Sequence, residues 1–420
     1  MLFVCFTSLL FVLLRSCLAL PKVMFLLRAL DTTAMGDLLD EFDSMTRGAL
    51  SKILGTPVSD VQWEQAKLPS SMGGLGLRSA VDHGPSAYAT SLLNAQPLVK
   101  SMLQLEDGEG EEESPLALEQ SLLDAISARR GEPIITESLI GVSQKSASYA
   151  VDLHNKSLLL NHFTQEGSAR NIARLASVGL EHSGDWLDAT PCPALGLHLR
   201  GPEFTASLKY RLGIPLYGVD SVCPACGAPN DRMGDHALGC AKYGERIARH
   251  NLIRDVLFEA AAGAALAPAR EGRHLLPGTQ ARPADVLIPR WVDGKDAAVD
   301  ITVTSSLSPS NLAAATAHPG GALTKAYERK VQGAAEGCRQ QGLAFVPFAL
   351  EALGGFHKVA TRQIKMLGAA LARQKGQEES ETTRHLFQRV SLTLARGNSS
   401  LLVSRSPEDD LLPPEVDGRL

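Results

Sequence analysis

The chain has 420 residues, of which 44% are hydrophobic and 21% are charged, and its formal net charge is −5 at pH 7. This composition is close to that of an ordinary soluble protein, so it excludes a wholly disordered chain and a membrane protein with many spans. The acidic balance also excludes a uniformly basic nucleic-acid coat and leaves local basic patches as the means of binding phosphate.

The first 30 residues are strongly apolar and admit two interpretations. Residues 1–14 are nearly all hydrophobic, and Cys17-Leu18-Ala19 resembles the small-residue site of a signal peptide. However, no basic residue precedes the run, and an apolar pattern resumes at residues 23–27, beyond the cleavage point. These features favour a buried helix, and a signal peptide or N-terminal anchor at residues 1–20 is the alternative.

Helical patterns dominate the first half of the chain. Apolar residues recur at helical spacing over residues 38–54, and Gly55-Thr56-Pro57 ends that segment. Six of the eight residues 106–113 are acidic, and their mutual repulsion predicts a solvated linker over 101–115. Residues 116–219 return to helical spacing, with a short helix at 203–213 that ends at Gly213.

A cluster of cysteine and histidine residues is typical of a zinc site. Three of the seven cysteines are Cys223, Cys226 and Cys240, within 18 residues of one another. His236 lies four positions before Cys240, so one helical turn places both side chains on one face. Four nitrogen and sulfur ligands complete a tetrahedral zinc site and leave no open position. We therefore predict a structural zinc ion in residues 220–245.

Two aspartates lie in strand-like runs, at 284–289 and 297–304, on either side of the turn sequence Asp293-Gly294. A hairpin through this turn would bring Asp285 and Asp300 together. Two converging carboxylates are suitable ligands for Mg²⁺, which can activate water for attack on a phosphodiester. The pair is therefore a candidate catalytic magnesium site.

Such a site also needs a cation, and the following segments supply candidates. A helix predicted over 323–341 carries Lys330 and, as the weaker choice, Lys325. Glu351 ends the next predicted strand, at 343–351, and is a possible further ligand. A helix at about 357–374 follows. These residues extend the candidate site from the hairpin to its neighbours.

The order of these motifs resembles the C-terminal half of polyproteins from non-LTR retrotransposons that carry a restriction-like endonuclease of the PD-(D/E)xK type. The resemblance covers about residues 12–375. It is carried by the zinc cluster, Arg249-His250-Asn251, Arg282-Pro283-Ala284-Asp285, Asp300, Lys330 and residues 351–355, and upstream by Trp63-Glu64-Gln65-Ala66-Lys67-Leu68-Pro69 and Gly73-Gly74-Leu75-Gly76-Leu77-Arg78. One departure is Thr302, which stands where the usual lysine follows the second acid.

The resemblance implies an α+β chain with a helical N-terminal half, a zinc knuckle and an α/β restriction-endonuclease-like core with a mixed sheet. The expected parts are a reverse-transcriptase thumb-like remnant (1–100), an acidic linker (101–115), a helical connector (116–219), a CCHC zinc knuckle (220–245), the endonuclease (246–376), a C-terminal helix (377–403) and a disordered tail (404–420). The only adjacent pair of aspartates is Asp409-Asp410 in this tail, so no polymerase active site is expected and the chain resembles a truncated element.

The implied activity is Mg²⁺-dependent nicking of target DNA for target-primed reverse transcription, with zinc as a structural ion. Arg249, His250 and Arg282 are expected to contact nucleic acid. Residues 200–290 carry 12 Lys and Arg against 9 Asp and Glu, and residues 325–396 carry 12 against 6, which suits phosphate binding.

The expected partners are DNA and the element's RNA, with no small-molecule cofactor, no stable membrane association and a nuclear or cytoplasmic location. Two alternatives stay open. One is a catalytically dead nucleic-acid-binding remnant, and the other is a secreted or membrane-anchored protein of unrelated function.

Overall fold

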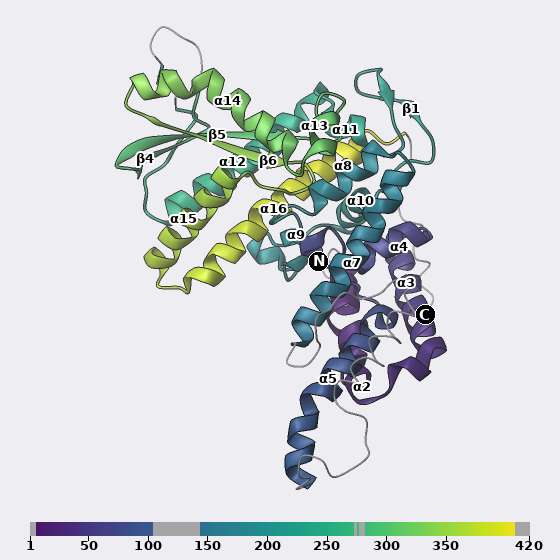
Figure 1. Ribbon diagram of the computed structural model, residues 1–420. Helices are drawn as coiled ribbons and strands as arrows, with labels where there is room; N and C mark the ends of the chain where they lie inside the picture. Colours follow the sequence, from purple (N-terminus) through teal and green to yellow (C-terminus); the bar gives the residue numbers. More distant parts are fainter. Residues whose placement is uncertain (1–5, 104–142, 273–274, 277–281, 408–420) are drawn as a thin grey trace. The chain divides into compact units, whose positions relative to one another are not determined.

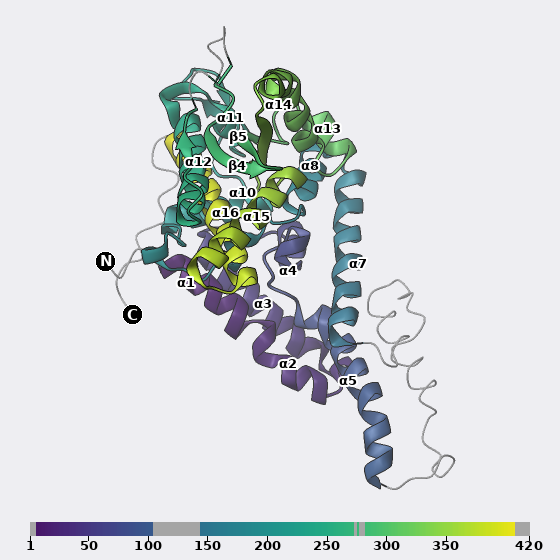
Figure 2. The same ribbon diagram turned by 90° about the vertical axis from the view of Figure 1, so that its left-hand side faces the viewer.

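The computed structural model describes residues 6–103, 143–272, 275–276 and 282–407 (Figures 1 and 2). The predicted linker beyond residue 103, the first part of the predicted connector and the tail from residue 408, with Asp409 and Asp410, lie outside the described residues. The chain divides into two compact units: a smaller one of Leu10–Pro69 and Gly76–Leu159, and a larger one of Met1–Leu9, Ser70–Leu75 and Leu160–Leu420.

Helices build the smaller unit. They are α2 (Leu20–Ala29), α3 (Gly36–Leu54), α4 (Asp60–Lys67) and α5 (Ala80–Leu103), together with the second half of α1 (Phe6–Leu13), η2 (Leu14–Leu18), η3 (Thr32–Met35) and the first part of α7 (Gln144–Gln165). Leu20 and Leu27 of α2 pack against Leu39 of α3 and two buried alanines of α5. Helix α3 corresponds to the predicted segment 38–54, and Gly55 ends it with a φ of 65°.

The apolar N-terminal segment is only partly covered. Phe25 is 79% exposed, whereas Leu27 is 1% exposed. Residues Thr7–Ala29 are long and apolar enough to cross a membrane by length and composition, and 22% of their most apolar window is buried. A core helix and a signal sequence pass the same test, so the segment leaves both interpretations of the N-terminus open.

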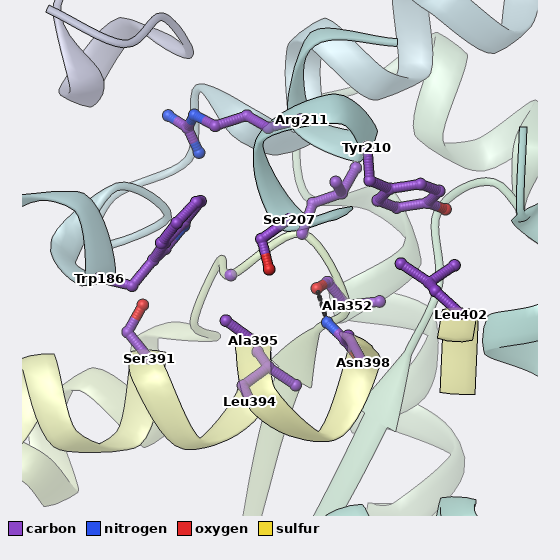
Figure 3. Close-up of a pocket in the computed structure, with 12 residues that line it drawn as sticks. Trp186, Ser207, Tyr210, Arg211, Ala352, Ser391, Leu394, Ala395, Asn398 and Leu402 are labelled. Atoms are coloured by element: carbon purple, nitrogen blue, oxygen red, sulfur yellow. Dashed lines mark hydrogen bonds between the residues drawn. The ribbon is translucent and has the colours of Figure 1, made fainter. Parts of the chain in front are cut away.

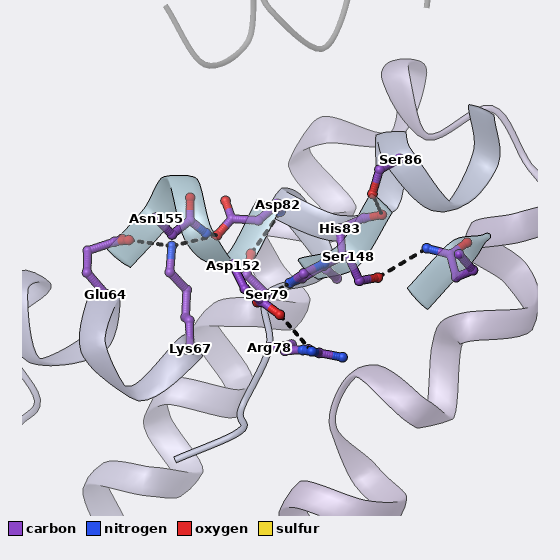
Figure 4. A network of polar contacts seen from close by, with 12 residues as sticks. Glu64, Lys67, Arg78, Ser79, Asp82, His83, Ser86, Ser148, Asp152 and Asn155 are labelled. Atoms are coloured by element: carbon purple, nitrogen blue, oxygen red, sulfur yellow. Dashed lines mark hydrogen bonds and ion pairs between the residues drawn. The ribbon is translucent and has the colours of Figure 1, made fainter. Parts of the chain in front are cut away.

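A buried polar network joins α4, α5 and α7 (Figure 4). The ammonium of Lys67 lies 2.8 Å from a Glu64 oxygen and 2.9 Å from an Asp82 oxygen. Asp152 on α7 accepts a hydrogen bond from Arg78 at 2.6 Å and lies 3.3 Å from Nε2 of His83. Because Lys67, Asp82 and Asp152 are largely removed from water, each needs its partner, and the network fixes how the three helices pack.

The larger unit contains a four-stranded mixed sheet in the order β3 (Ala269–Arg270), β4 (Val286–Val292), β5 (Lys295–Thr304) and β6 (Ala344–Glu351). Strands β4 and β5 are antiparallel, and β5 and β6 are parallel. Asp293 and Gly294 form the predicted hairpin turn with φ values of 50° and 74°, the left-handed conformations that a tight turn of this hand requires. The predicted α+β class with a mixed sheet is confirmed.

Successive residues of β5 face opposite sides of the sheet, which separates core from site. Val299 and Ile301 face a core built with α12 (Glu245–Gly263), α15 (Lys358–Lys375) and α16 (Glu379–Ser404). Ala298 faces the other side, where Cys338 of α14 (Gly321–Gln340) is buried. Figure 1 draws α14 and α15 on opposite sides of the sheet. The predicted C-terminal helix is α16, and it packs in this same core.

Shorter elements complete the larger unit. They are α8 (Ala169–Val178), α9 (Asp185–Asp188), α10 (Gly201–Leu212), β1 (Ser221–Val222), β2 (Pro229–Asn230), α11 (Asp235–Gly239), α13 (Leu312–Ala317), η4 (Ser70–Met72), η5 (Pro193–Leu195) and η6 (Lys242–Gly244). Helix α10 ends at Gly213 with a φ of 68°, as its sequence predicts.

Candidate functional site

The predicted cysteine and histidine cluster forms a compact group. The ligand atoms of Cys223, Cys226, His236 and Cys240 all lie within 4.8 Å of one another. Sγ of Cys226 is 3.3 Å from Nε2 of His236, and Sγ of Cys223 is 3.9 Å from Sγ of Cys240. Tetrahedral zinc with nitrogen and sulfur ligands separates them by roughly 3.5–3.8 Å. The cluster could therefore bind a metal such as zinc.

Local backbone geometry brings these four ligands together. The β1–β2 hairpin presents the two first cysteines, and Gly227 turns the chain between them and β2 with a φ of 73°. The carboxylate of Asp231 binds the start of α11, because it accepts hydrogen bonds from the backbone N–H groups of Asp235 and His236 at 3.0 and 2.8 Å. These two hydrogen bonds hold the short helix in the position that places His236 beside the cysteines.

Arg405, at the end of α16, supports the last cysteine. Its guanidinium is fully buried and donates to both carboxylate oxygens of Glu245, at 2.7 and 2.9 Å. Burial opposes ionisation of the Cys240 thiol, but the contact with Arg405 and the neighbouring thiols outweighs it and lowers the pKa of Cys240. A lowered pKa favours the thiolate, which is the form that binds metal.

The two predicted aspartates meet on the sheet. Asp285 lies directly before β4, and its backbone N–H donates to the carbonyl of Val299, the neighbour of Asp300 on β5. The Asp285 carboxylate lies close enough to Asp300 to raise the pKa of that carboxyl group. Oδ2 of Asp285 also accepts the backbone N–H of Ile301 at 2.6 Å. The hairpin therefore brings the pair together, as the spacing predicts.

Lys330 joins this pair, and Lys325 does not. Nζ of Lys330 lies 2.9 Å from Oδ1 and 2.9 Å from Oδ2 of Asp300. Lys325 is one and a half turns earlier on α14, and its ammonium donates instead to the backbone carbonyl of Ser310 at 2.7 Å. Of the two predicted lysines, the structure thus places Lys330 at the site.

The two carboxyl groups have opposite electrostatic surroundings. Burial, together with the neighbouring Asp285 charge, raises the pKa of Asp300 even though Lys330 opposes this shift. Burial also disfavours the charged form of Asp285, but His250 and the Ile301 N–H outweigh it and lower the pKa of Asp285. Such a split is expected where two carboxylates share one small site and need a cation to be charged together.

A cavity of about 550 Å³ opens beside Asp285 and Lys330. Its lining includes the basic residues Arg246, Arg249, His250, Arg254, Arg282 and Lys330, together with Glu271 and Asp285. Thr302 also lines it, two residues beyond Asp300 on the same face of β5. We name this cavity the arginine groove. Its concave form and cationic walls suit a phosphodiester backbone.

Two predicted site residues have other surroundings. Arg249 is buried at the edge of the groove, and its Nη1 donates to Oδ1 of Asn398 on α16 at 2.7 Å. Glu351 is fully buried on β6, and its partner in the β5–β6 register is Thr304, which is four residues beyond Asp300 on β5. Its carboxylate accepts the N–H of Ser306 at 2.7 Å. Burial raises the pKa of Glu351 to about 7. It therefore does not join the aspartate pair.

Arg246 and Arg254 are groove residues that the sequence interpretation missed. They lie four positions before and after His250 on α12, so all three occupy one face of this helix. This i, i+4, i+8 spacing of basic residues is the signal that would have found them. Arg282, the remaining predicted contact, is exposed at the groove wall and lies 3.4 Å from Glu271.

A second cavity lies between α10 and α16 (Figure 3), with Trp186, Ser207 and Asn398 in its wall. The amide of Asn398 donates to the carbonyl of Ala352 at 2.6 Å. The cavity holds about 30 Å³. That volume admits roughly two water molecules and no substrate, so this site is structural.

Comparison with known proteins adds no family assignment. No protein-family model matches the sequence, and no curated protein matches it. Function is therefore inferred from the geometry of the two clusters and of the arginine groove.

Proposed function

We propose that this chain is the Mg²⁺-dependent DNA endonuclease module of a non-LTR retrotransposon protein, with a structural zinc knuckle at residues 220–245. One observation carries the proposal. Asp285, Asp300 and Lys330 come from three separate segments; Lys330 is paired with Asp300, and Asp285 and Lys330 both line the arginine groove. Two carboxylates and a lysine beside a cationic groove form the set that phosphodiester hydrolysis requires.

Each residue has a defined task in this proposal. Asp285 and Asp300 hold the divalent ion, which when bound supplies the positive charge that activates water and offsets charge on the phosphate. Lys330 holds the Asp300 carboxylate in place and presents N–H donors to a phosphate oxygen. Arg246, Arg254 and Arg282 contact the DNA backbone along the groove and set its register without reading sequence.

The zinc knuckle has an architectural role in the same proposal. Cys240 lies five residues before Glu245, where α12 begins, and α12 carries the groove residues. Zinc binding would order the chain directly ahead of this helix. Structural zinc sites commonly supply folding free energy in this way.

The biological step follows from the resemblance of the motifs. A nick in target DNA leaves a 3′-hydroxyl from which a reverse transcriptase can extend a copy of the element's RNA.

A plasmid-nicking assay tests the proposal. Zinc-loaded protein is incubated with supercoiled plasmid and Mg²⁺ or Mn²⁺, and open-circular product is measured. Asp285→Asn and Asp300→Asn keep side-chain shape but remove the charge, so nicking is expected to fall on the order of 10²-fold or more. Asp296→Asn is the matched control, because Asp296 lies on β5 and accepts the Arg290 N–H at the hairpin.

One observation favours a second candidate, a catalytically dead DNA-binding remnant. Thr302 stands where nucleases of this type place a lysine, and it cannot supply a charge. If the wild-type protein binds DNA but makes no nick with either metal, the endonuclease proposal is wrong and the remnant takes its place.

A further inference from the structure

His250 contacts the aspartate pair from a third direction. It lies on α12, and its Nε2 is 3.0 Å from Oδ1 of Asp285. The other carboxylate oxygen of Asp285 accepts the backbone N–H of Ile301 at 2.6 Å. Both oxygens are therefore held, one by the strand and one by the helix. A DNA contact, the role expected from the motif alone, does not account for this geometry.

The geometry also separates His250 from the metal ligands. Among the residues that the structure describes, one group brings three or more Cys, His, Asp or Glu ligand atoms within 4.8 Å of one another. This group is the zinc cluster. His250, Asp285 and Asp300 do not form such a group. The imidazole therefore contacts the Asp285 carboxylate, but it is not placed to bind one ion together with both aspartates.

We propose that His250 is a positioning residue that orients Asp285 for divalent-ion binding. This inference rests on the function proposed above. Each carboxylate oxygen has two lone pairs, so Oδ1 can accept the Nε2–H of His250 and still bind an ion. The arrangement parallels that of Asp300, which Lys330 holds from α14. Each aspartate is held by a side chain from a different helix.

The helix that carries His250 is firmly anchored. Ile253 and Leu257 are buried in the core beneath the sheet. Arg249, the residue directly before His250, is buried and bonded to Asn398 on α16. An anchored helix places the imidazole with little freedom, which is the property that an outer partner of a metal ligand needs.

Two substitutions separate the hydrogen bond from side-chain bulk. His250→Phe keeps a ring but removes the donor, and His250→Gln keeps an N–H donor of similar reach. His318→Ala is the control, because His318 is an exposed histidine at the end of α13. Thermal unfolding of the zinc-loaded proteins is measured first, and His250→Gln supplies a folded comparison if the phenylalanine variant is destabilised.

Binding of Mn²⁺ to the zinc-loaded protein is then measured by calorimetry, with Asp285→Asn as the check that the ion occupies the pair. Loss of a partner that orients a metal ligand typically costs about 10–100-fold in affinity. We expect that loss in His250→Phe, a much smaller one in His250→Gln and none in His318→Ala. The Mn²⁺ concentration for half-maximal nicking should shift by the same factor, with DNA affinity unchanged.

Two results overturn the inference. If His250→Phe binds Mn²⁺ as the wild type does but loses DNA affinity, His250 is a phosphate contact. If His250→Gln is as defective as His250→Phe, the hydrogen bond is not what matters. If the wild-type protein binds Mn²⁺ at the pair and nicks DNA, either of these results overturns this inference and leaves the proposed function intact. A wild-type protein that neither binds Mn²⁺ nor nicks DNA overturns the proposed function and His250's role with it.

Discussion

Lys330 and Asp300, 30 residues apart in the sequence, form an ion pair in which the ammonium lies 2.9 Å from both carboxylate oxygens. The pairing joins α14 to β5 on the side of the sheet opposite the main core. It is possible because Asp300 and Thr302 alternate with core residues along the strand, so both lie on the side of the sheet opposite that core, where Thr302 and Lys330 line the groove. The lysine thereby reaches the site from a helix although position 302 is a threonine.

Lys330→Met should impair nicking far more than DNA binding. The substitution removes the charge that holds Asp300, so we expect nicking to fall on the order of 10²-fold. DNA affinity should change by about threefold or less, since one lysine among many basic groups contributes little. Lys325→Met is the control, because that ammonium bonds to Ser310. The reverse ranking in a plasmid assay with parallel binding titrations would show that Lys325 is the functional lysine.

Removing zinc should unfold the segment around residues 220–245. Metal binding to such sites carries apparent free energies of about 10–16 kcal/mol. Cys226→Ala, or a strong chelator, should therefore release one zinc per chain and reduce the thermal stability of the larger unit. Cys192→Ala, at a half-buried cysteine outside the cluster, should retain zinc. Purified protein without zinc, and circular dichroism unchanged by chelation, would refute this prediction.

Glu351 should make the stability of the fold depend on pH. Burial raises its pKa from 4.5 to about 7, so the folded state disfavours the ionised carboxylate. Stability is full below about pH 4.5 and falls as the pH rises from there to about 7, by on the order of 3 kcal/mol. Glu351→Gln resembles the protonated form and should remove this dependence. Urea unfolding at pH 5 and pH 8 measures the free energy of unfolding of the wild type and of Glu351→Gln. An equal change between the two pH values in both proteins would contradict the prediction.

The N-terminal helix should contribute to folding through one face only. Leu27 is buried against α3 and α5, so Leu27→Ala should lower the free energy of unfolding by about 2–5 kcal/mol. Phe25 is two positions away and exposed, so Phe25→Ala should be nearly neutral. Denaturant unfolding of both variants measures the difference. Equal effects would mean that this segment does not pack as a folded helix in solution.

The sequence alone predicted the features that depend on local geometry. The Asp293-Gly294 hairpin, the end of α10 at Gly213 and the pairing of Cys223 with Cys226 all follow from residues within a few positions of one another. Turn conformations and helix ends are set by φ and ψ preferences and short-range hydrogen bonds, which a sequence pattern records directly. The order of β4, β5, α14, β6 and α15 follows from periodicity in the same way, whereas β3 and α13 were not predicted.

Tertiary structure decided the contacts between elements. It placed Lys330 at Asp300, brought His250 to Asp285 and buried Arg249 against Asn398, 149 residues away. It also placed Glu351 opposite Thr304 on β5, four residues beyond Asp300, so Glu351 does not join the aspartate pair. Such contacts depend on which face a helix turns toward the sheet and on strand register. Packing of the whole core sets both, because a small rotation or a one-residue shift moves every side chain to a different neighbour.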